Sequence, residues 1–339
     1  MLFNHCISNP PYQHQSTSTN NTSVVKNIFH LFQHYADTYS DNSLLIYPFG
    51  RWFQQGGKGM KNFGTQHINN KHIYHVYHYE TKGVFPNVNI GDDVCITHVS
   101  QAYDKLFFIY DDITIRKPGD SILPMEKKYI TIVNKIFQMM SQYNLCSLTE
   151  RKNPRTLYGI ESTFVHNNKD KAIPTETTSR KPHCDDRVVR LLTNDKPGVS
   201  GRAHWYWIKL SDIPQGHEYI DTYHFVVKSA QYSNQEGIID NGIIIPAGAA
   251  YGRSKVSIIT VDTEEEITNF NTYIRTNFCK SLYKQSSGGG MTHICRFIPD
   301  LYDYTSDNTL IDWSKPLDKQ IYNLCRFTQE EIDIIEHDA

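Results

Sequence analysis

Hydrophobic and polar positions in the first 110 residues follow two periods in turn. Short apolar runs, which favour strands, alternate with stretches whose apolar residues recur at helical spacing. The predicted strands are 2–7, 43–47, 73–79, 94–99 and 106–110, and the predicted helices are 23–38 and about 59–69. Strands that alternate with helices predict a mostly parallel, helix-covered sheet, with the last two strands as an antiparallel hairpin at its edge.

The pattern changes after residue 112. Pro118, Gly119 and Pro124 indicate a linker at 113–126, and helical periodicity follows at about 126–142. Beyond it, short β-like stretches alternate with polar loops, and two helices are predicted near the end of the chain. The β-like stretches are 205–210, 223–232 and 242–247, and the helices are 263–283 and 328–337.

These elements predict an α/β fold, in which a partial Rossmann-like sheet precedes an irregular β-rich α+β domain. We assign 1–112 to the sheet domain and 113–145 to a linker and helix. We assign 146–300 to the β-rich domain and 301–339 to a tail with a short helix.

Composition predicts a folded, soluble protein without a uniformly basic surface. Hydrophobic residues make up 39% of the chain, and its formal net charge is −2, so nucleic-acid contacts would come from local basic clusters. The seven cysteines are odd in number and lack Cys-x-x-Cys spacing, which favours reduced thiols over a disulfide framework or a zinc ribbon. No apolar run approaches the roughly 20 residues of a membrane span, and the first residues do not resemble a signal peptide. The expected location is therefore the cytoplasm.

The sharpest chemical signal is Cys6-Ile7-Ser8-Asn9-Pro10-Pro11-Tyr12, at the end of the first predicted strand. An exocyclic amino group of a base is a poor nucleophile, because its lone pair is delocalised into the ring. The Asn9 side-chain oxygen and the Pro10 carbonyl could accept its hydrogens and draw that lone pair towards tetrahedral geometry. Pro11 stiffens the turn, and Tyr12 offers a face to an extruded base, worth about 1–3 kcal/mol. Taken alone, the tetrapeptide is better explained as a turn or a polyproline fragment, and it is its position after an apolar strand that favours the catalytic interpretation.

The stretches around this motif resemble a known family. FNHCISNPPYQ, SLLIYPFGRWFQQGGKGMKNFG and VFPNVNIGDDVCIT are similar to the catalytic half of TaqI-like, gamma-class adenine-N6 DNA methyltransferases of type II restriction–modification systems. The C-terminal stretch from Arg296 to Glu336 is similar to the family's tail. The resemblance implies a methyltransferase sheet with Asn9, Pro10, Pro11 and Tyr12 as catalytic residues. It also implies base flipping and methyl transfer from S-adenosylmethionine to adenine N6 in double-stranded DNA.

The family's cofactor elements have no counterpart in the sequence. Gamma-class enzymes carry a glycine-rich loop and an acidic residue upstream of Asn-Pro-Pro-Tyr, whereas eight residues precede Asn9. Gly288-Gly289-Gly290 follows a predicted helix, and Gly56–Gly59 lacks the spacing of a phosphate loop. The expectation is that the S-adenosylmethionine-binding half is missing, so that a separate chain supplies it or the reading frame is truncated. The cofactor-binding residues stay unassigned.

Basic residues interleaved with aromatic ones form the candidate DNA-binding set. In a target-recognition domain such residues hold phosphates or read guanine edges. For any single residue, a solvated surface beside core tryptophans is the simpler interpretation. The candidates are Arg180, Lys181, Arg187, Arg190, Arg202, Arg253 and Lys255, with Lys196, Lys209 and the run Trp205-Tyr206-Trp207 nearby.

No metal site is predicted. His72, His75 and His78 recur every third residue of a predicted strand, which distributes them over both faces. His183-Cys184-Asp185-Asp186 lacks the companion residues of a zinc deaminase or a nuclease, and Asp111-Asp112 is predicted to be a loop.

Three functional hypotheses follow. The first is a site-specific adenine methyltransferase, the second a non-catalytic DNA-specificity subunit, and the third a restriction endonuclease component on a methylase-like scaffold. The expected partners are double-stranded DNA and either a chain with the cofactor half or a cognate restriction endonuclease. No membrane partner is expected.

Overall fold

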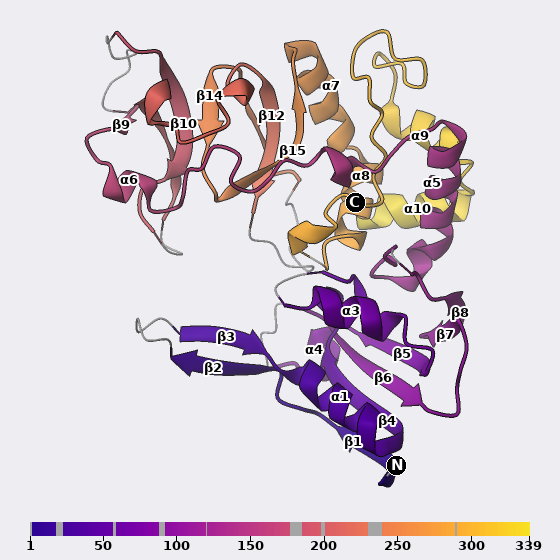
Figure 1. Cartoon of the computed structure of the whole chain (residues 1–339). Helices are drawn as coiled ribbons and strands as arrows, with labels where there is room; N and C mark the ends of the chain where they lie inside the picture. The colour runs from indigo at the N-terminus through magenta and orange to yellow at the C-terminus, as the bar shows by residue number, and fades with distance from the viewer. Residues whose placement is uncertain are drawn as a thin grey trace. The chain divides into compact units, whose positions relative to one another are not determined.

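The computed structural model separates into two compact units, each with its own sheet system (Figure 1). It describes residues 2–17, 23–56, 59–87, 92–119, 121–176, 185–197, 201–229, 239–288 and 290–339. Described residues within 1–134 and 284–294 form unit 1. Those within 135–230, 236–283 and 295–339 form unit 2. Unit 1 is therefore built from two stretches of chain that are distant in sequence.

Unit 1 contains a six-stranded mixed sheet in the order β1-β4-β6-β5-β7-β8. Its strands are β1 (Phe3–Ser8), β4 (Ser40–Pro48), β5 (Ile73–Tyr79), β6 (Val94–Ser100), β7 (Phe107–Tyr110) and β8 (Ile113–Arg116). The predicted strands and the α/β class are confirmed, but the expectation of a mostly parallel sheet is wrong. Only β1/β4 and β5/β7 are parallel among these pairs, while β4/β6, β5/β6 and β7/β8 are antiparallel.

The predicted hairpin between 94–99 and 106–110 is also wrong, because β5 lies between β6 and β7. The hairpin is instead β7–β8, where Tyr110 is paired with Ile113 across a two-residue turn. Asp111 has a φ of 54° there, as the first position of tight hairpin turns requires. Residues 113–116, predicted as linker, thus form the outermost strand.

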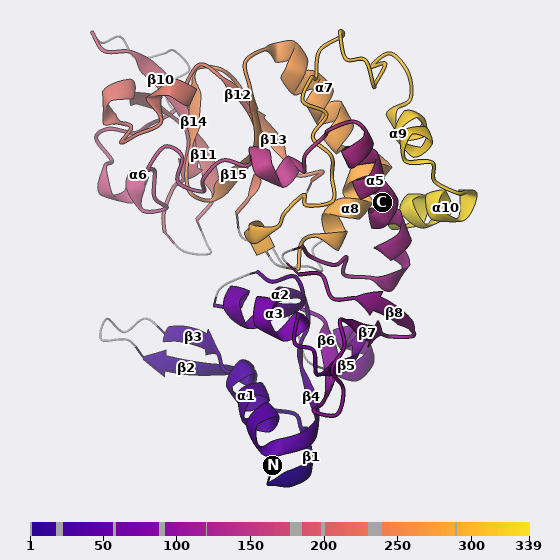
Figure 2. The same cartoon turned by 45° about the vertical axis from the view of Figure 1, so that its right-hand side comes forward.

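Helices α1 (Phe29–Tyr39), α2 (Gly50–Phe53) and α3 (Lys61–Ile68) cover one face of this sheet. The short helix α4 (Thr81–Val84) lies beside Ile46 and Ile96, whose side chains point to the other face. Large side chains from this layer and from the sheet, including Trp52, Tyr47 and Phe108, are fully buried in one core. The predicted helix at 23–38 begins only at Phe29. Residues 23–27 form β3 (Ser23–Asn27), paired with β2 (Gln13–Thr17) in a hairpin that extends from the sheet in both views (Figures 1 and 2).

A polar cluster lies inside this core. The Tyr47 hydroxyl is 3.1 Å from Gln33 Oε1, 2.8 Å from His67 Nε2 and 2.7 Å from Thr97 Oγ1. Burial lowers the pKa of His67 to about 3, so the neutral ring is the stable form there. These contacts connect α1, β4, α3 and β6, and they satisfy polar groups that would otherwise be costly to bury.

Unit 2 contains two further sheets with helices beside them. One has the order β14-β10-β11-β9 and the other β13-β12-β15. The strands are β9 (Ile173–Pro174), β10 (Val188–Asn194), β11 (Ala203–Lys209), β12 (Tyr223–Lys228), β13 (Ile243–Ile245), β14 (Ala249–Tyr251) and β15 (Lys255–Val261). The predicted β-rich character is confirmed, although β9, β10, β14 and β15 were not predicted as strands.

The helices of unit 2 follow the predicted apolar stripes with one break. The helix predicted at 263–283 is two helices, because Thr276 Oγ1 accepts a hydrogen bond from the Cys279 N–H and caps a new helix start. The helix predicted at about 126–142 is confirmed as α5. None of the helices in the described ranges is long and apolar enough to cross a membrane. The helices are α5 (Ile130–Gln142), α6 (Phe164–Asn167), α7 (Glu264–Ile274), α8 (Asn277–Gln285), α9 (Leu317–Cys325) and α10 (Gln329–Asp338), of which α6 and α9 were not predicted.

Candidate functional site

The Asn9–Tyr12 loop lies at the carboxyl end of β1. Ser8, the last residue of β1, is paired with Leu45 of the parallel strand β4, so the loop leaves the sheet at the edge where β4 also ends. Asn9 and Pro11 are exposed and Pro10 is buried. The Asn9 amide makes no hydrogen bond within the described residues. Its oxygen is therefore available to a ligand.

Tyr12 is anchored more deeply than the other loop residues. Its carbonyl accepts a hydrogen bond from the Ile28 N–H at 3.0 Å, and its ring packs against the core of unit 1. Its hydroxyl is buried and has no hydrogen-bond partner within the described residues. Burial, and then the nearby Cys95 thiol, raise the pKa of Tyr12 to about 12, so the phenol stays neutral. The hydroxyl thus points into the protein, and only part of the ring remains open to a base.

A hollow of about 450 Å³ opens near the same edge of the sheet. It is lined by Ile46, Tyr79, Glu80, Gly83, Val84 and Ile96. Ile46 follows Leu45, the partner of Ser8, but successive strand side chains point to opposite faces, and none of residues 9–12 lines the hollow. Its volume is within the range of about 300–1,000 Å³ that small-ligand sites occupy.

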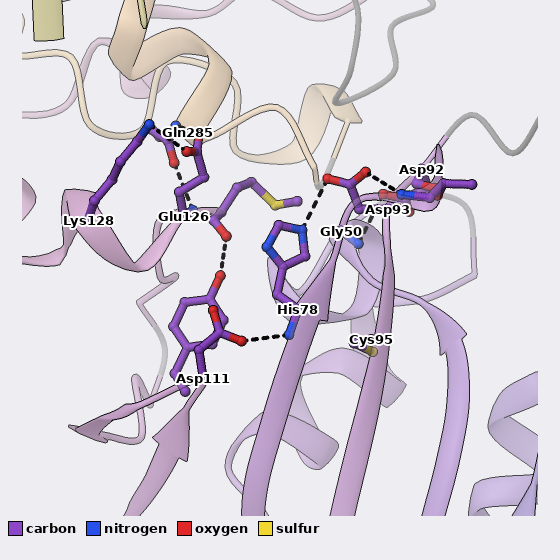
Figure 3. A network of polar contacts seen from close by, with 12 residues as sticks. Gly50, His78, Asp92, Asp93, Cys95, Asp111, Glu126, Lys128 and Gln285 are labelled. Carbon is purple, nitrogen blue, oxygen red and sulfur yellow. Dashed lines mark hydrogen bonds and ion pairs between the residues drawn. The ribbon is translucent and has the colours of Figure 1, made fainter. Parts of the chain in front are cut away.

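Beyond β4, two aspartates stabilise the edge of the sheet. Asp92 Oδ1 accepts a hydrogen bond from the Gly50 N–H at 3.1 Å, at the start of α2. The Asp92 carbonyl accepts one from Thr81 Oγ1 at 2.6 Å. The Asp93 carbonyl accepts a third from the Phe49 N–H at 2.7 Å. The loop before β6 therefore fixes the turn after β4 and the start of α4 (Figure 3).

His78 connects this network to the neighbouring strands. Its Nε2 is 3.1 Å from Asp93 Oδ2, and its ring stacks on Phe49 at 4.4 Å between centroids. The backbone N–H of His78 donates to Asp111 Oδ1 at 2.8 Å (Figure 3). Asp111, expected to be a plain loop residue, thus holds the turn of the β7–β8 hairpin against β5. No group of three or more His, Cys, Asp or Glu in the described ranges could hold a metal ion.

The C-terminal end of α8 completes unit 1 near this edge. Gln285, 1% exposed, accepts a hydrogen bond from the Glu126 N–H at 2.9 Å and donates one from Nε2 to Glu126 Oε1 at 2.7 Å. Its carbonyl accepts hydrogen bonds from Gln54 Nε2 and from the Met125 N–H. Lys128 Nζ is 3.0 Å from Glu126 Oε2 (Figure 3).

Two glycines allow this close approach. A Cβ atom on Gly288 would lie 2.5 Å from Met125 Sδ, 2.9 Å from Gln54 Oε1 and 3.1 Å from the Gly50 Cα. A Cβ atom on Gly50 would lie 2.7 Å from Asp92 Oδ1 and 3.1 Å from the Gly288 Cα. The glycines at 288–290 were predicted only to follow a helix, and nothing local in the sequence indicates this packing.

The predicted DNA-binding residues that the structure describes all lie in unit 2, in different surroundings. Arg187 forms a two-point ion pair with Asp221, and Arg253 forms an ion pair with Glu161. These two cations are therefore already neutralised by carboxylates. Arg180 and Lys181 lie outside the described residues.

The remaining candidates keep more of their charge available. The Arg190 guanidinium carbon is 5.0 Å from the Trp205 ring centroid. Arg202 is exposed, and its backbone N–H donates to Asp195 Oδ1 at 2.9 Å. Lys255 is half-buried, and burial, followed by the nearby Lys228, lowers its pKa. Arg190 and Arg202 are thus the better placed of the described candidates to meet a phosphate.

Comparison with known proteins finds similarity to one family model over part of the chain and to several solved structures. The model of the family described as "Eco57I restriction-modification methylase" matches residues 1–85, which contain the Asn9–Tyr12 loop. No curated protein matches the chain. Among solved structures, the type IIL restriction–modification enzyme MmeI in complex with DNA is 9% identical, with a TM-score of 0.41, over 99% of this chain and 56% of that one.

Two further solved structures are similar over part of their length. The type IIG restriction endonuclease BpuSI is 9% identical, with a TM-score of 0.29, over 95% of this chain and 49% of that one. A chain of a type I restriction–modification system is 11% identical, with a TM-score of 0.25, over 42% of this chain and 30% of that one. The chain therefore spans between about a third and just over half of the solved chains that it matches.

Proposed function

We propose that this chain is the catalytic and target-recognition part of an adenine-N6 DNA methyltransferase of a restriction–modification system. The observation that carries the proposal is the exposed, unengaged Asn9 amide, placed at a strand's carboxyl end by a proline-stiffened loop within the stretch matched by the methylase family. Ligands of open α/β sheets bind at such edges.

In this proposal, Asn9 Oδ1 and the Pro10 carbonyl accept the two hydrogens of the adenine amino group. Two acceptors favour a tetrahedral nitrogen, whose lone pair is directed outward and is more nucleophilic. The extruded adenine lies against Asn9 and contacts the open part of the Tyr12 ring. Pro11 limits the movement of the loop, so less ordering is required when the base arrives.

S-adenosylmethionine would supply the methyl group, but the described residues do not fit it. Gly50 and Gly288, which lie at the same edge, pack against each other and leave no glycine-lined cradle between them. We therefore propose that the cofactor-binding segment lies outside these residues and extends the sheet at β1.

Support for this extension comes from the surface of β1. No described strand pairs with its outer edge, and Leu2, Phe3 and Ile7 are 74%, 62% and 78% exposed. Beside it, a largely apolar hollow of about 210 Å³ separates β1 from α1, where Tyr35 is 61% exposed. β1 carries no Lys, Pro or bulge that would protect a free edge. Residues 146–300 would then recognise the target sequence.

The test is methylation by the chain together with the products of its neighbouring genes. Asn9→Ala should reduce N6-methyladenine formation in plasmid DNA by about 10²-fold or more, as is typical when one polarising contact is removed from an active site. DNA binding should persist. Asn4→Ala is the matched control, because Asn4 is an exposed asparagine of β1, the strand that precedes the Asn9 loop. Equal methylation by the two variants would refute the assigned role of Asn9.

A second measurement addresses the cofactor. Calorimetric titration of the isolated chain with S-adenosylmethionine should show no binding. Stoichiometric binding to the isolated chain would contradict a cofactor site outside these residues.

A further inference from the structure

β11 presents an aromatic and basic surface on one face of its sheet. Trp205, Trp207 and Lys209 alternate with Tyr206 and Ile208, so the two sets point to opposite faces. Tyr206 and Ile208 are 4% and 1% exposed and belong to the core of unit 2. The two tryptophans are only half-buried and Lys209 is exposed.

Arg190 adds a positive charge to this face. It is the register partner of Trp207, and its guanidinium lies over the Trp205 ring. Within the described residues neither Arg190 nor Lys209 forms an ion pair. By contrast, Arg187, the residue just before β10, forms an ion pair with Asp221. Arg190 and Lys209 therefore remain able to attract an anion.

A hollow of about 460 Å³ opens beside Trp207. Apolar groups of Ile173, Val188 and Trp207 form part of its wall, and Ile173 is paired with Trp207 in the sheet. Its charged lining consists of Asp170, Lys171, Lys209 and Asp212, of which Lys171 and Asp212 are 3.1 Å apart. A flat aromatic wall with polar groups at the rim suits a planar, hydrogen-bonding ligand.

We propose that this surface, formed by Arg190, Trp205, Trp207 and Lys209, holds an unpaired nucleotide of the DNA substrate. The inference rests on the proposed function, since extrusion of a base for methylation leaves another base without a partner. The unpaired base stacks on Trp207 in the hollow, and Arg190 and Lys209 contact its flanking phosphates. Aromatic side chains bind splayed bases in this way, whereas bases within an intact duplex expose no ring face.

The test compares binding of the full chain to two labelled duplexes that differ only by one bulged, unpaired base. The unaltered chain should prefer the bulged duplex. Trp207→Ala should weaken binding to it by about 5- to 150-fold, the equivalent of one base stack, and should leave affinity for the intact duplex nearly unchanged. Trp207→Phe, which keeps an aromatic face, should restore most of the preference.

Charge is tested with a matched arginine pair. Arg190→Gln should weaken binding and lower its salt dependence, whereas Arg187→Gln, which removes an already neutralised cation, should have little effect. If Trp207→Ala lowers the melting temperature, Trp207→Phe and Arg190→Gln provide the decisive comparison.

Three outcomes would overturn the inference: no preference of the unaltered chain for the bulged duplex, no change in Trp207→Ala, or occupation of this face by a protein partner in place of DNA. Its failure is separable from that of the proposed function. Asn9→Ala should reduce methylation and leave the preference for the bulged duplex intact, whereas Trp207→Ala should abolish that preference, so the binding assay can fail while the methylation assay succeeds.

Discussion

Gly288→Ala tests the packing of the returning segment 284–294 against the edge of the unit 1 sheet. The new Cβ atom would lie 2.5 Å from Met125 Sδ and 2.9 Å from Gln54 Oε1, both closer than ordinary contact. The side chain of Met125 can move, but the Gly50 Cα at 3.1 Å is backbone and cannot yield without shifting α2. The substitution therefore forces segment 284–294 away from α2.

Overpacking of this kind costs about 1–3 kcal/mol. For a unit of roughly 150 residues, each kcal/mol lowers the melting temperature by about 2–4 °C, so a decrease of about 2–12 °C is expected. Gly83→Ala is the matched control, because nothing lies within 4 Å of its added Cβ atom and Gly83 is in α4. Alanine in a helix should stabilise the control by up to about 1 kcal/mol.

The assay combines calorimetry of the full chain with hydrogen exchange. Gly288→Ala should accelerate exchange at Met125 and Glu126, whose N–H groups donate to the Gln285 carbonyl and to Gln285 Oε1. Gly83→Ala should leave exchange at these positions unchanged. Identical melting and exchange in the two variants would show that Gly288 does not hold the segment in place.

Two further predictions concern unit 1. Tyr12→Phe removes a buried hydroxyl that has no hydrogen-bond partner within the described residues, so stability and methylation should be retained; a loss comparable to that of Asn9→Ala would assign the hydroxyl a catalytic role. His67 has a pKa of about 3 against 6.5 when unfolded, so its contribution to stability is complete above pH 6.5 and is lost as the pH falls towards 3. The melting temperature of His67→Gln should therefore depend less on pH between 7 and 4 than that of the unaltered chain, and parallel curves would contradict the buried neutral ring. Asp37 works in the opposite direction, because burial raises its pKa from 3.8 to about 6, so its contribution is lost as the pH rises through 6.

Local patterns were sufficient to predict most strands of unit 1. The run Ser43–Tyr47 and the strand at 73–79 are apolar and bounded by Pro48 or polar turns, and both are strands in the structure. The position of Asn9 after a strand followed from the same pattern. These features depend on neighbours in sequence, which is why one sequence is enough to find them.

The order of the strands could not be predicted in the same way. Whether 94–99 is paired with 73–79 or with 106–110 depends on contacts among distant residues, and the sequence pattern is the same in both cases. The β2–β3 hairpin was missed for two reasons. Residues 13–17, which form β2, are all polar, and the apolar residues after 23 also fit a helix. The role of 284–294 was missed because a glycine run indicates a turn but does not reveal which surface it meets.

The returning segment has a practical consequence for protein engineering. Since unit 1 is completed by residues 284–294, a fragment that ends at residue 134 would lack Gln285 and expose the polar groups of Gln54 and Glu126 that it satisfies. Exchange of unit 2 between related proteins would need one junction on each side of this short stretch, in addition to the junction near residue 134. Grafts that respect those boundaries should yield chimaeras that fold. A single crossover would instead combine segment 284–294 of one protein with the unit 1 surface of the other.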